Sequence, residues 1–174
     1  MNKDIEKFEG FLSEEDFKIV HEDAYSKVRP MKDCGNLSTF KTNYTIWDKR
    51  IVDQSSIVLV HDIIDQRIVD ILNRSVKVKF NNLPVSYMYY YWTNGSYIPW
   101  HEDGHATHAG TLYLNEKWDR NWGGYYMYES NDGNIKALKP ESNLFVLQHN
   151  STPHCTTATT QGSDIRVSVQ MFFK

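Results

Sequence analysis

The chain has 174 residues and a mass of 20.4 kDa, a size at which one domain can bury a substantial hydrophobic core. Its net charge is -3, its pI is about 6.1 and its 19 Lys and Arg residues are scattered, which argues against nucleic acid or an anionic membrane as the main partner. Two cysteines, no apolar signal core and no apolar run near the roughly 20 residues of a membrane span predict a cytoplasmic protein.

The N-terminal segment has the pattern of an amphipathic helix. Ser13 stands three residues before Asp16, as in an approximate capping box, and apolar residues then recur at helical spacing. This predicts a first helix over about 13–26. The irregular segment that follows, 28–53, is expected to be mainly loop, with a short strand candidate at Tyr44–Trp47.

A second stripe of Ile, Val and Leu residues lies between Ser55-Ser56 and Asn73-Arg74. Its helical spacing over 57–72 predicts a second helix whose role is packing support. After it the period changes to two, because apolar residues alternate with lysines over 76–80. That alternation predicts a strand.

The rest of the chain is rich in β-forming residues, with turn signals between the runs. Further strands are expected at Val85–Trp92, Thr111–Asn115, Tyr125–Glu129, Asn143–Gln148 and Arg166–Phe173. Helices followed by many short strands indicate an α+β fold whose main body is a β-sandwich or jelly roll. We therefore expect a single domain over 1–174, with helical support over about 1–75 and a β core over about 76–174.

The tripeptide His101-Glu102-Asp103 is the first candidate for a metal site. Residues two apart on a strand point the same way, so His101 and Asp103 can face one point. A third ligand has to come from another strand, and His149 and His154 both follow an apolar run. His154 is preferred, because a proline fixes the approaching chain and the distance to Arg166 suits a hairpin. Two imidazoles and one carboxylate are the ligands of non-heme Fe(II) oxygenases.

Two further histidines, His105 and His108, follow Asp103 in the sequence. We interpret them as loop residues near the mouth of a pocket, with metal ligation as the alternative. Nothing in their spacing selects them over the distal histidines.

Arg166 begins a strand in which it shares one face with Ser168. An arginine that faces inward is costly unless an anion meets it. Its planar fork matches a carboxylate with two parallel hydrogen bonds, and Ser168 can add a third. A surface or salt-bridged arginine is the alternative interpretation.

The ordered set of these motifs resembles the 2-oxoglutarate and Fe(II)-dependent dioxygenases, in particular their prolyl 4-hydroxylase-like branch. The resemblance covers about half of the chain, Tyr87 to Phe173. It is carried by Tyr91-Trp92-Thr93-Asn94-Gly95-Ser96-Tyr97, His101-Glu102-Asp103, Thr111-Leu112-Tyr113-Leu114-Asn115, Trp122-Gly123-Gly124, Pro153-His154 and Arg166. It implies a double-stranded β-helix, which is a cupin-like jelly roll, with supporting N-terminal helices.

The resemblance also implies the cofactors and their ligands. His101, Asp103 and His154 would bind Fe(II), with 2-oxoglutarate and O2 as co-substrates and ascorbate as an additional candidate. Tyr113 would donate a hydrogen bond to the distal carboxylate of 2-oxoglutarate beside Arg166. The family's chemistry would then hydroxylate a substrate while 2-oxoglutarate is converted to succinate and CO2.

Two tyrosines before the metal motif are weaker candidates for co-substrate binding. The family's aromatic usually stands three residues before the iron-binding histidine, whereas Tyr97 stands four before His101. Tyr91 is a candidate for the cavity wall, and a buried strand aromatic is the alternative. The segment Asn115–Asn121, with two nearby tryptophans, is the candidate for a flexible lid over the substrate.

The expected substrate is a proline-containing peptide or protein, because of the resemblance and because tyrosine and tryptophan rings can stack on a pyrrolidine ring. The same chemistry on a small molecule or on another amino-acid side chain is the alternative. A nucleic-acid demethylase would need a basic groove, for which there is no Lys or Arg cluster. A non-catalytic metal- or ligand-binding jelly roll would leave Arg166 and the His-x-Asp spacing without a purpose.

Overall fold

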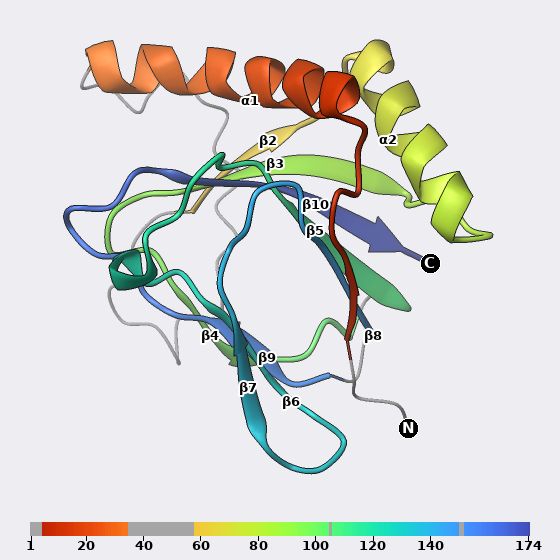
Figure 1. Ribbon diagram of the computed structural model, residues 1–174, viewed down its shortest axis with the longest axis vertical. Helices are drawn as coiled ribbons and strands as arrows, with labels where there is room; N and C mark the ends of the chain where they lie inside the picture. The colour runs from red at the N-terminus through yellow and green to blue at the C-terminus, as the bar shows by residue number, and fades with distance from the viewer. Residues whose placement is uncertain (1–4, 35–57, 105, 150–151) are drawn as a thin grey trace.

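Two antiparallel sheets face each other in the computed structural model, which describes residues 5–34, 58–104, 106–149 and 152–174 (Figure 1). The larger sheet has the strand order β1 (Glu6–Phe8), β8 (Phe145–His149), β5 (His108–Tyr113), β10 (Arg166–Phe173), β3 (Ser86–Trp92) and β2 (Val58–Asp62). The smaller has the order β4 (Ile98–His101), β9 (His154–Thr156), β6 (Tyr126–Glu129) and β7 (Ile135–Leu138). This arrangement confirms the predicted sandwich.

The helices α1 (Glu14–Cys34) and α2 (Gln66–Lys79) lie on the side of the larger sheet that faces away from the smaller one (Figure 1). The N-terminus of α1 is capped as predicted, because the Ser13 hydroxyl accepts a hydrogen bond from the Asp16 amide at 3.1 Å. Three acidic residues in the first turn of α1 complement the helix dipole. Within the described ranges, neither helix is long and apolar enough to cross a lipid bilayer.

The central strands β3 and β10 have two faces with different tasks. Tyr87, Tyr89 and Tyr91 of β3 pack against the helices, whereas Met88, Tyr90 and Trp92 face the space between the sheets. Strand β10 alternates in the same way: Val167, Val169, Met171 and Phe173 belong to the helix-side core, and Arg166, Gln170 and Phe172 line the interior. The predicted period-two alternation of β10 is therefore confirmed.

The predicted second helix is wrong in its first third. Residues 58–62 form the edge strand β2, which pairs with β3, and the helix begins only after Asp65, whose side chain accepts from the Arg67 amide at 2.9 Å. The apolar run at the start of this segment is rich in β-branched residues, which fit a strand as well as one face of a helix. The spacing of its apolar residues alone therefore did not distinguish the two.

The strand predicted over 76–80 is also wrong, because α2 continues to Lys79. Val76 is fully buried against the sheet, and the Phe80 amide donates to its carbonyl at 2.8 Å. The lysines that alternate with apolar residues lie in the last helical turn, where they favour the helix dipole. The strand candidate at Tyr44–Trp47 lies outside the described residues.

A tight contact in the larger sheet gives a stability prediction. A Cβ atom on Gly110 of β5 would lie 2.4 Å from Cζ of Phe145, which is fully buried and stacked on Phe11. Gly110→Ala is expected to lower the free energy of unfolding by about 1–3 kcal/mol through overpacking, and the Tm by about 2–4 °C per kcal/mol. Thermal unfolding measures this. Gly162→Ala, where an added Cβ meets nothing within 4 Å, is the matched control, and equal Tm values for the two variants would contradict the prediction.

Candidate active site

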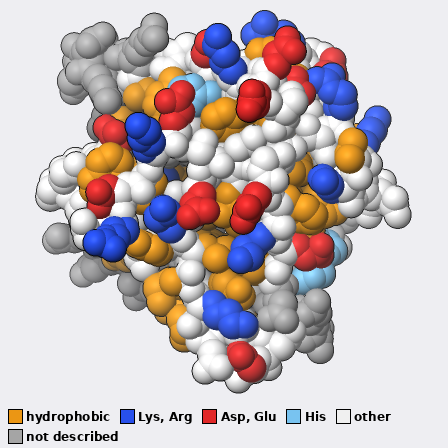
Figure 2. Space-filling model, viewed as in Figure 1, with side chains coloured by type: hydrophobic (Ala, Val, Ile, Leu, Met, Phe, Trp, Pro, Cys, Tyr) orange, Lys and Arg blue, Asp and Glu red, His pale blue; other side chains and the backbone are white. Residues whose placement is uncertain are grey.

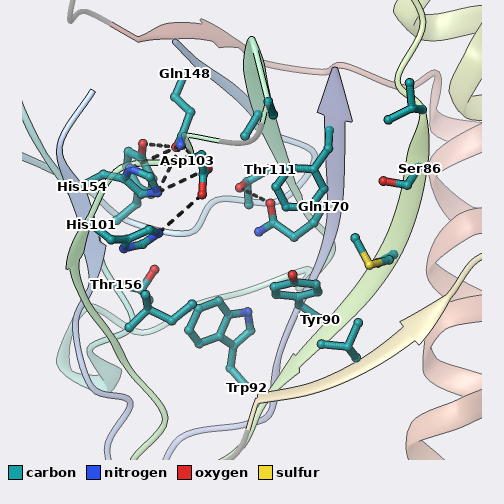
Figure 3. Close-up of a pocket in the computed structure, with 18 of the residues that line it drawn as sticks. Ser86, Tyr90, Trp92, His101, Asp103, Thr111, Gln148, His154, Thr156 and Gln170 are labelled. Carbon is teal, nitrogen blue, oxygen red and sulfur yellow. Dashed lines mark hydrogen bonds and ion pairs between the residues drawn. The ribbon is translucent and has the colours of Figure 1, made fainter. Parts of the chain in front are cut away.

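A cavity of about 460 Å³ lies between the two sheets (Figure 3). Its lining is apolar along β2 and part of β3 and β10, where Val60, Met88 and Phe172 face it. Polar and ionisable side chains gather on the opposite side, from β4, β8 and β9. The cavity therefore has one wall suited to metal or acid–base chemistry and one suited to an apolar ligand.

His101, Asp103 and His154 converge in this cavity. One ligand atom from each lies within 4.8 Å of those of the other two. Nε2 of His101 is 3.7 Å from Oδ1 of Asp103, and Nε2 of His154 is 3.7 Å from Oδ2. His101 ends β4 and His154 begins β9, and the two residues are direct cross-strand partners. The structure thus brings the three predicted ligand residues together.

The backbone fixes which nitrogen of each histidine faces the ligand group. Nδ1 of His101 is 2.7 Å from the Pro99 carbonyl oxygen, and Nδ1 of His154 is 2.9 Å from that of Thr152. A carbonyl can only accept, so each Nδ1–H donates and each Nε2 keeps its lone pair toward Asp103. Burial, and then the nearby His101 imidazole, lower the pKa of His154. A neutral imidazole is the form that binds a metal.

Gln148 of β8 holds the carboxylate of this group and was not predicted. Its amide nitrogen donates to Oδ2 of Asp103 at 2.7 Å and lies 3.1 Å from Nε2 of His154. Its amide oxygen accepts from the Tyr126 hydroxyl, so the orientation of the amide is fixed. A glutamine in an otherwise apolar, buried strand is the signal that could have identified it.

Removing this amide is expected to weaken metal binding. Gln148→Leu should reduce the affinity for Mn(II), a stable stand-in for Fe(II), by roughly 10- to 100-fold, the usual effect of losing an outer-shell partner. Tyr126→Phe removes only the bond that orients the amide and should have a smaller effect. Isothermal titration measures both, and an unchanged affinity in folded Gln148→Leu protein would refute the role.

Arg166 lies at another end of the cavity between two aromatic rings. Its side chain is 1% exposed, and its guanidinium carbon is 4.4 Å from the ring centroid of Trp92 and 5.0 Å from that of Tyr113. Gly124 closes the site, because a Cβ there would be 3.2 Å from Cδ of Arg166. Trp92 was not predicted as a site residue. The alternation of β3 would have placed it on the same interior face as Tyr90.

Three buried polar atoms at this end of the cavity have no hydrogen-bond partner among the residues that the structure describes. They are Nε and Nη1 of Arg166 and the hydroxyl of Tyr113. Burial lowers the pKa of Arg166, and it raises the pKa of Tyr113 against the opposing charge of the guanidinium. A buried cation with two unused donors beside an unused hydroxyl is stable only when an anion completes it. A carboxylate matches these donors.

The other predicted co-substrate residues lie elsewhere. Ser168 is fully buried on the interior face, but its hydroxyl oxygen already accepts from Nε1 of Trp92 at 3.3 Å. Tyr91 faces the helices, and its hydroxyl donates to the Ala24 carbonyl at 3.0 Å. Tyr97 is half-buried and does not line the cavity. Tyr91 is therefore the buried strand aromatic that was its alternative interpretation.

His108 and His149, the other candidate ligands that the structure describes, do not join the group. His149 is a cross-strand partner of His108, and their ring centroids are 4.6 Å apart. His108 begins β5, so its predicted position in a loop is wrong. His105 lies outside the described residues. Gln148 points into the cavity, so His149, the next residue of β8, lies on the other face of the sheet and away from the ligand group.

The predicted lid segment 115–121 is joined by hydrogen bonds to the chain beside Arg166. The Asn115 side chain donates to the Ile165 carbonyl at 2.8 Å and accepts from the Val167 amide at 2.7 Å. The Trp118 ring is buried, and its indole nitrogen donates to the Gly123 carbonyl at 2.9 Å. These bonds tie Asn115 to the residues on either side of Arg166 and tie Trp118 to Gly123.

Comparisons with known proteins agree with this geometry. A family model described as the 2OG-Fe(II) oxygenase superfamily matches residues 85–174. A search of the curated proteins finds no significant match to the sequence.

Solved structures share the fold at low identity. A Trichoplax adhaerens prolyl hydroxylase, solved with a peptide fragment of the hypoxia inducible factor oxygen degradation domain, has a TM-score of 0.76 at 15% identity, covering 98% of this chain and 84% of its own. A Pseudomonas putida prolyl-4-hydroxylase has 0.70 at 13%, covering 98% and 91%. SnoN, a non-heme alpha ketoglutarate dependent epimerase from nogalamycin biosynthesis, has 0.67 at 10%, covering 98% and 76%. These similarities confirm the predicted double-stranded β-helix.

Proposed function

This chain belongs to the 2OG-Fe(II) oxygenase superfamily, and from that premise we propose that it hydroxylates prolyl residues of a peptide or protein. The family's cofactors are Fe(II), 2-oxoglutarate and O2. The observation that supports the site assignment is the pairing of the His-Asp-His group with a buried arginine whose Nε and Nη1 have no partner in the described ranges.

The residues of the cavity fit both groups. His101, Asp103 and His154 would hold Fe(II) through two neutral imidazoles and one carboxylate, a set that leaves coordination positions open. Arg166 and Tyr113 would hold the distal carboxylate of 2-oxoglutarate with the buried donors that otherwise lack acceptors. When bound together, Fe(II) and 2-oxoglutarate supply the activation of O2 and the transfer of one oxygen atom to a C–H bond.

The chain's own contribution is to orient these groups and to exclude water. Gln148 fixes the Asp103 carboxylate, and the Tyr126 ring stacks on His154 at a centroid distance of 5.4 Å. Trp92 and Tyr113 shield the guanidinium on two sides. Electrostatic interactions are stronger in such a water-poor site, so Arg166 would bind the distal carboxylate of 2-oxoglutarate more strongly than an exposed arginine would.

The apolar wall supports a substrate with an aliphatic ring. Val60, Met88 and Phe172 line the cavity from strands of the larger sheet, whereas His101 and His154 come from the smaller one, and Tyr90 and Trp92 add ring faces. Similarity in fold to two prolyl hydroxylases supports the same choice. A small molecule is the second candidate, because about 460 Å³ can enclose one entirely.

The charge pattern of the surface disfavours the nucleic-acid alternative. Figure 2 shows Lys and Arg side chains interspersed with Asp and Glu on the face that it displays, rather than gathered into a basic groove. Single-stranded nucleic acid binds along such a groove.

An assay of the reaction products tests the proposal in two parts. Purified protein with Fe(II), ascorbate and 2-oxoglutarate is expected to form succinate only when O2 is present. Proline-rich peptides are expected to stimulate this turnover and to gain the mass of one oxygen atom. No succinate from folded, iron-loaded protein would refute the cofactor assignment. Succinate without any peptide oxidation, together with oxidation of a small molecule, would refute the prolyl substrate alone.

A further inference from the structure

The wall that faces the ligand group carries polar side chains among its apolar ones, and they are Ser86, Tyr90, Thr111 and Gln170. Tyr90 of β3 and Gln170 of β10 both line the cavity, on neighbouring strands. Tyr90 pairs with Ser168 and Gln170 pairs with Met88, so Tyr90 and Gln170 are diagonal neighbours on one face of the sheet. Figure 3 shows them across the cavity from His101, Asp103 and His154.

Gln170 presents its amide nitrogen to the cavity. Thr111, its partner on the other side in β5, donates its hydroxyl hydrogen to the amide oxygen of Gln170 at 2.9 Å. The Thr111 hydroxyl needs an acceptor because it is buried, and this fixes the orientation of the amide. Among the described residues, Nε2 of Gln170 has no hydrogen-bond partner, so its two N–H groups are available to a ligand.

Tyr90 adds a second donor. Its side chain is 6% exposed, and its hydroxyl has no hydrogen-bond partner in the described part of the chain. Burial, and then the negative charges of Asp103 and Asp62, raise the pKa of Tyr90 to about 12. The phenol therefore keeps its proton at neutral pH and can donate it.

A neutral acceptor suits this pair of donors. Tyr90 and Gln170 both offer uncharged donor groups. The negative charge of Asp62 also acts on the Tyr90 hydroxyl, which disfavours an anion beside it. A carbonyl oxygen of an amide accepts two donors without carrying a charge.

We infer that Tyr90 and Gln170 form a subsite that binds an amide carbonyl of the substrate, next to the residue that is oxidised. This inference rests on the proposed function, because it assumes that substrate enters the cavity opposite His101, Asp103 and His154. The subsite distinguishes an amide, such as a peptide backbone, from a free acid.

A binding experiment tests the subsite without requiring turnover. Protein loaded with Mn(II) and 2-oxoglutarate is titrated with N-acetyl-L-proline methylamide, and paramagnetic broadening of the ligand's proton resonances reports both binding and closeness to the metal. Tyr90→Phe and Gln170→Met are each expected to weaken binding by roughly 2- to 12-fold, the value of one lost hydrogen bond. The free acid N-acetyl-L-proline should bind more weakly than the amide.

The control is Tyr87→Phe, a neighbour in β3 whose hydroxyl donates to Asn73 on the helix side. It should leave amide binding unchanged, and all variants should retain their affinity for Mn(II) and 2-oxoglutarate. The subsite is refuted if the double variant Tyr90→Phe/Gln170→Met binds the amide as wild type does, if wild type prefers the free acid, or if wild type does not bind the amide. If the wild-type protein does not bind Mn(II) or 2-oxoglutarate, the proposed function is refuted instead.

Discussion

His154→Ala is expected to abolish measurable Fe(II) binding and 2-oxoglutarate turnover, whereas His149→Ala leaves both unchanged. His154 supplies one of three ligand atoms that lie within 4.8 Å of one another, and its loss should exceed the roughly 10- to 100-fold effect of losing an outer-shell partner. His149 is five residues away in the sequence, but its ring lies against His108. Both variants replace a histidine by alanine in neighbouring parts of the chain, but only His154→Ala removes a predicted metal ligand.

Metal affinity and activity are measured separately for this pair. Mn(II) titration reports the ligand group directly, and succinate formation with Fe(II) reports its chemistry. Thermal unfolding checks that each variant is folded. Equal affinities for Mn(II) in His154→Ala and His149→Ala proteins would show that the metal binds elsewhere.

Arg166→Lys is expected to raise the KM for 2-oxoglutarate by roughly 100-fold without changing Mn(II) affinity. Lysine keeps the positive charge but cannot form two parallel hydrogen bonds with a carboxylate, and each hydrogen bond to a charged group contributes about 1.5–3 kcal/mol. Arg166→Met removes the charge as well and should have a larger effect. Tyr113→Phe removes one neutral donor, and an increase of about tenfold is expected.

Arg120→Met is the matched control, because this arginine is exposed. Steady-state kinetics at saturating Fe(II) gives the KM, and a difference spectrum of the Fe(II)–2-oxoglutarate complex gives an independent affinity. If Arg166→Lys protein binds 2-oxoglutarate as wild type does, the unpaired guanidinium must serve another anion.

The sequence predicted the faces of long strands better than the presence of short ones. The interior positions of β10, from Arg166 to Phe172, followed directly from an alternation of eight residues. The strands β4 and β9 have four and three residues, which is too short for a period to be visible. Both carry ligand residues, so His101 and His154 were found from chemical type and spacing.

The contacts that complete the site depend on register between distant strands. Gln148 reaches Asp103 across 45 positions of sequence, and Trp92 covers Arg166 because β3 pairs with β10. The local sequence indicates that Gln148 and Trp92 point inward, but it does not show which residues they contact. The pairing of strands decides that, and it depends on the whole sheet. The same reason explains the error in 57–62, where only the partner strand distinguishes β2 from a helix.

The two faces of β3 have a consequence for engineering this protein. The odd-numbered tyrosines anchor the helical layer, and the even-numbered positions border the reaction space, so mutational libraries confined to Ser86, Met88 and Tyr90 can vary selectivity while leaving the scaffold's thermal tolerance largely intact. A deletion of one residue ahead of this strand would exchange the two sets and damage both properties together.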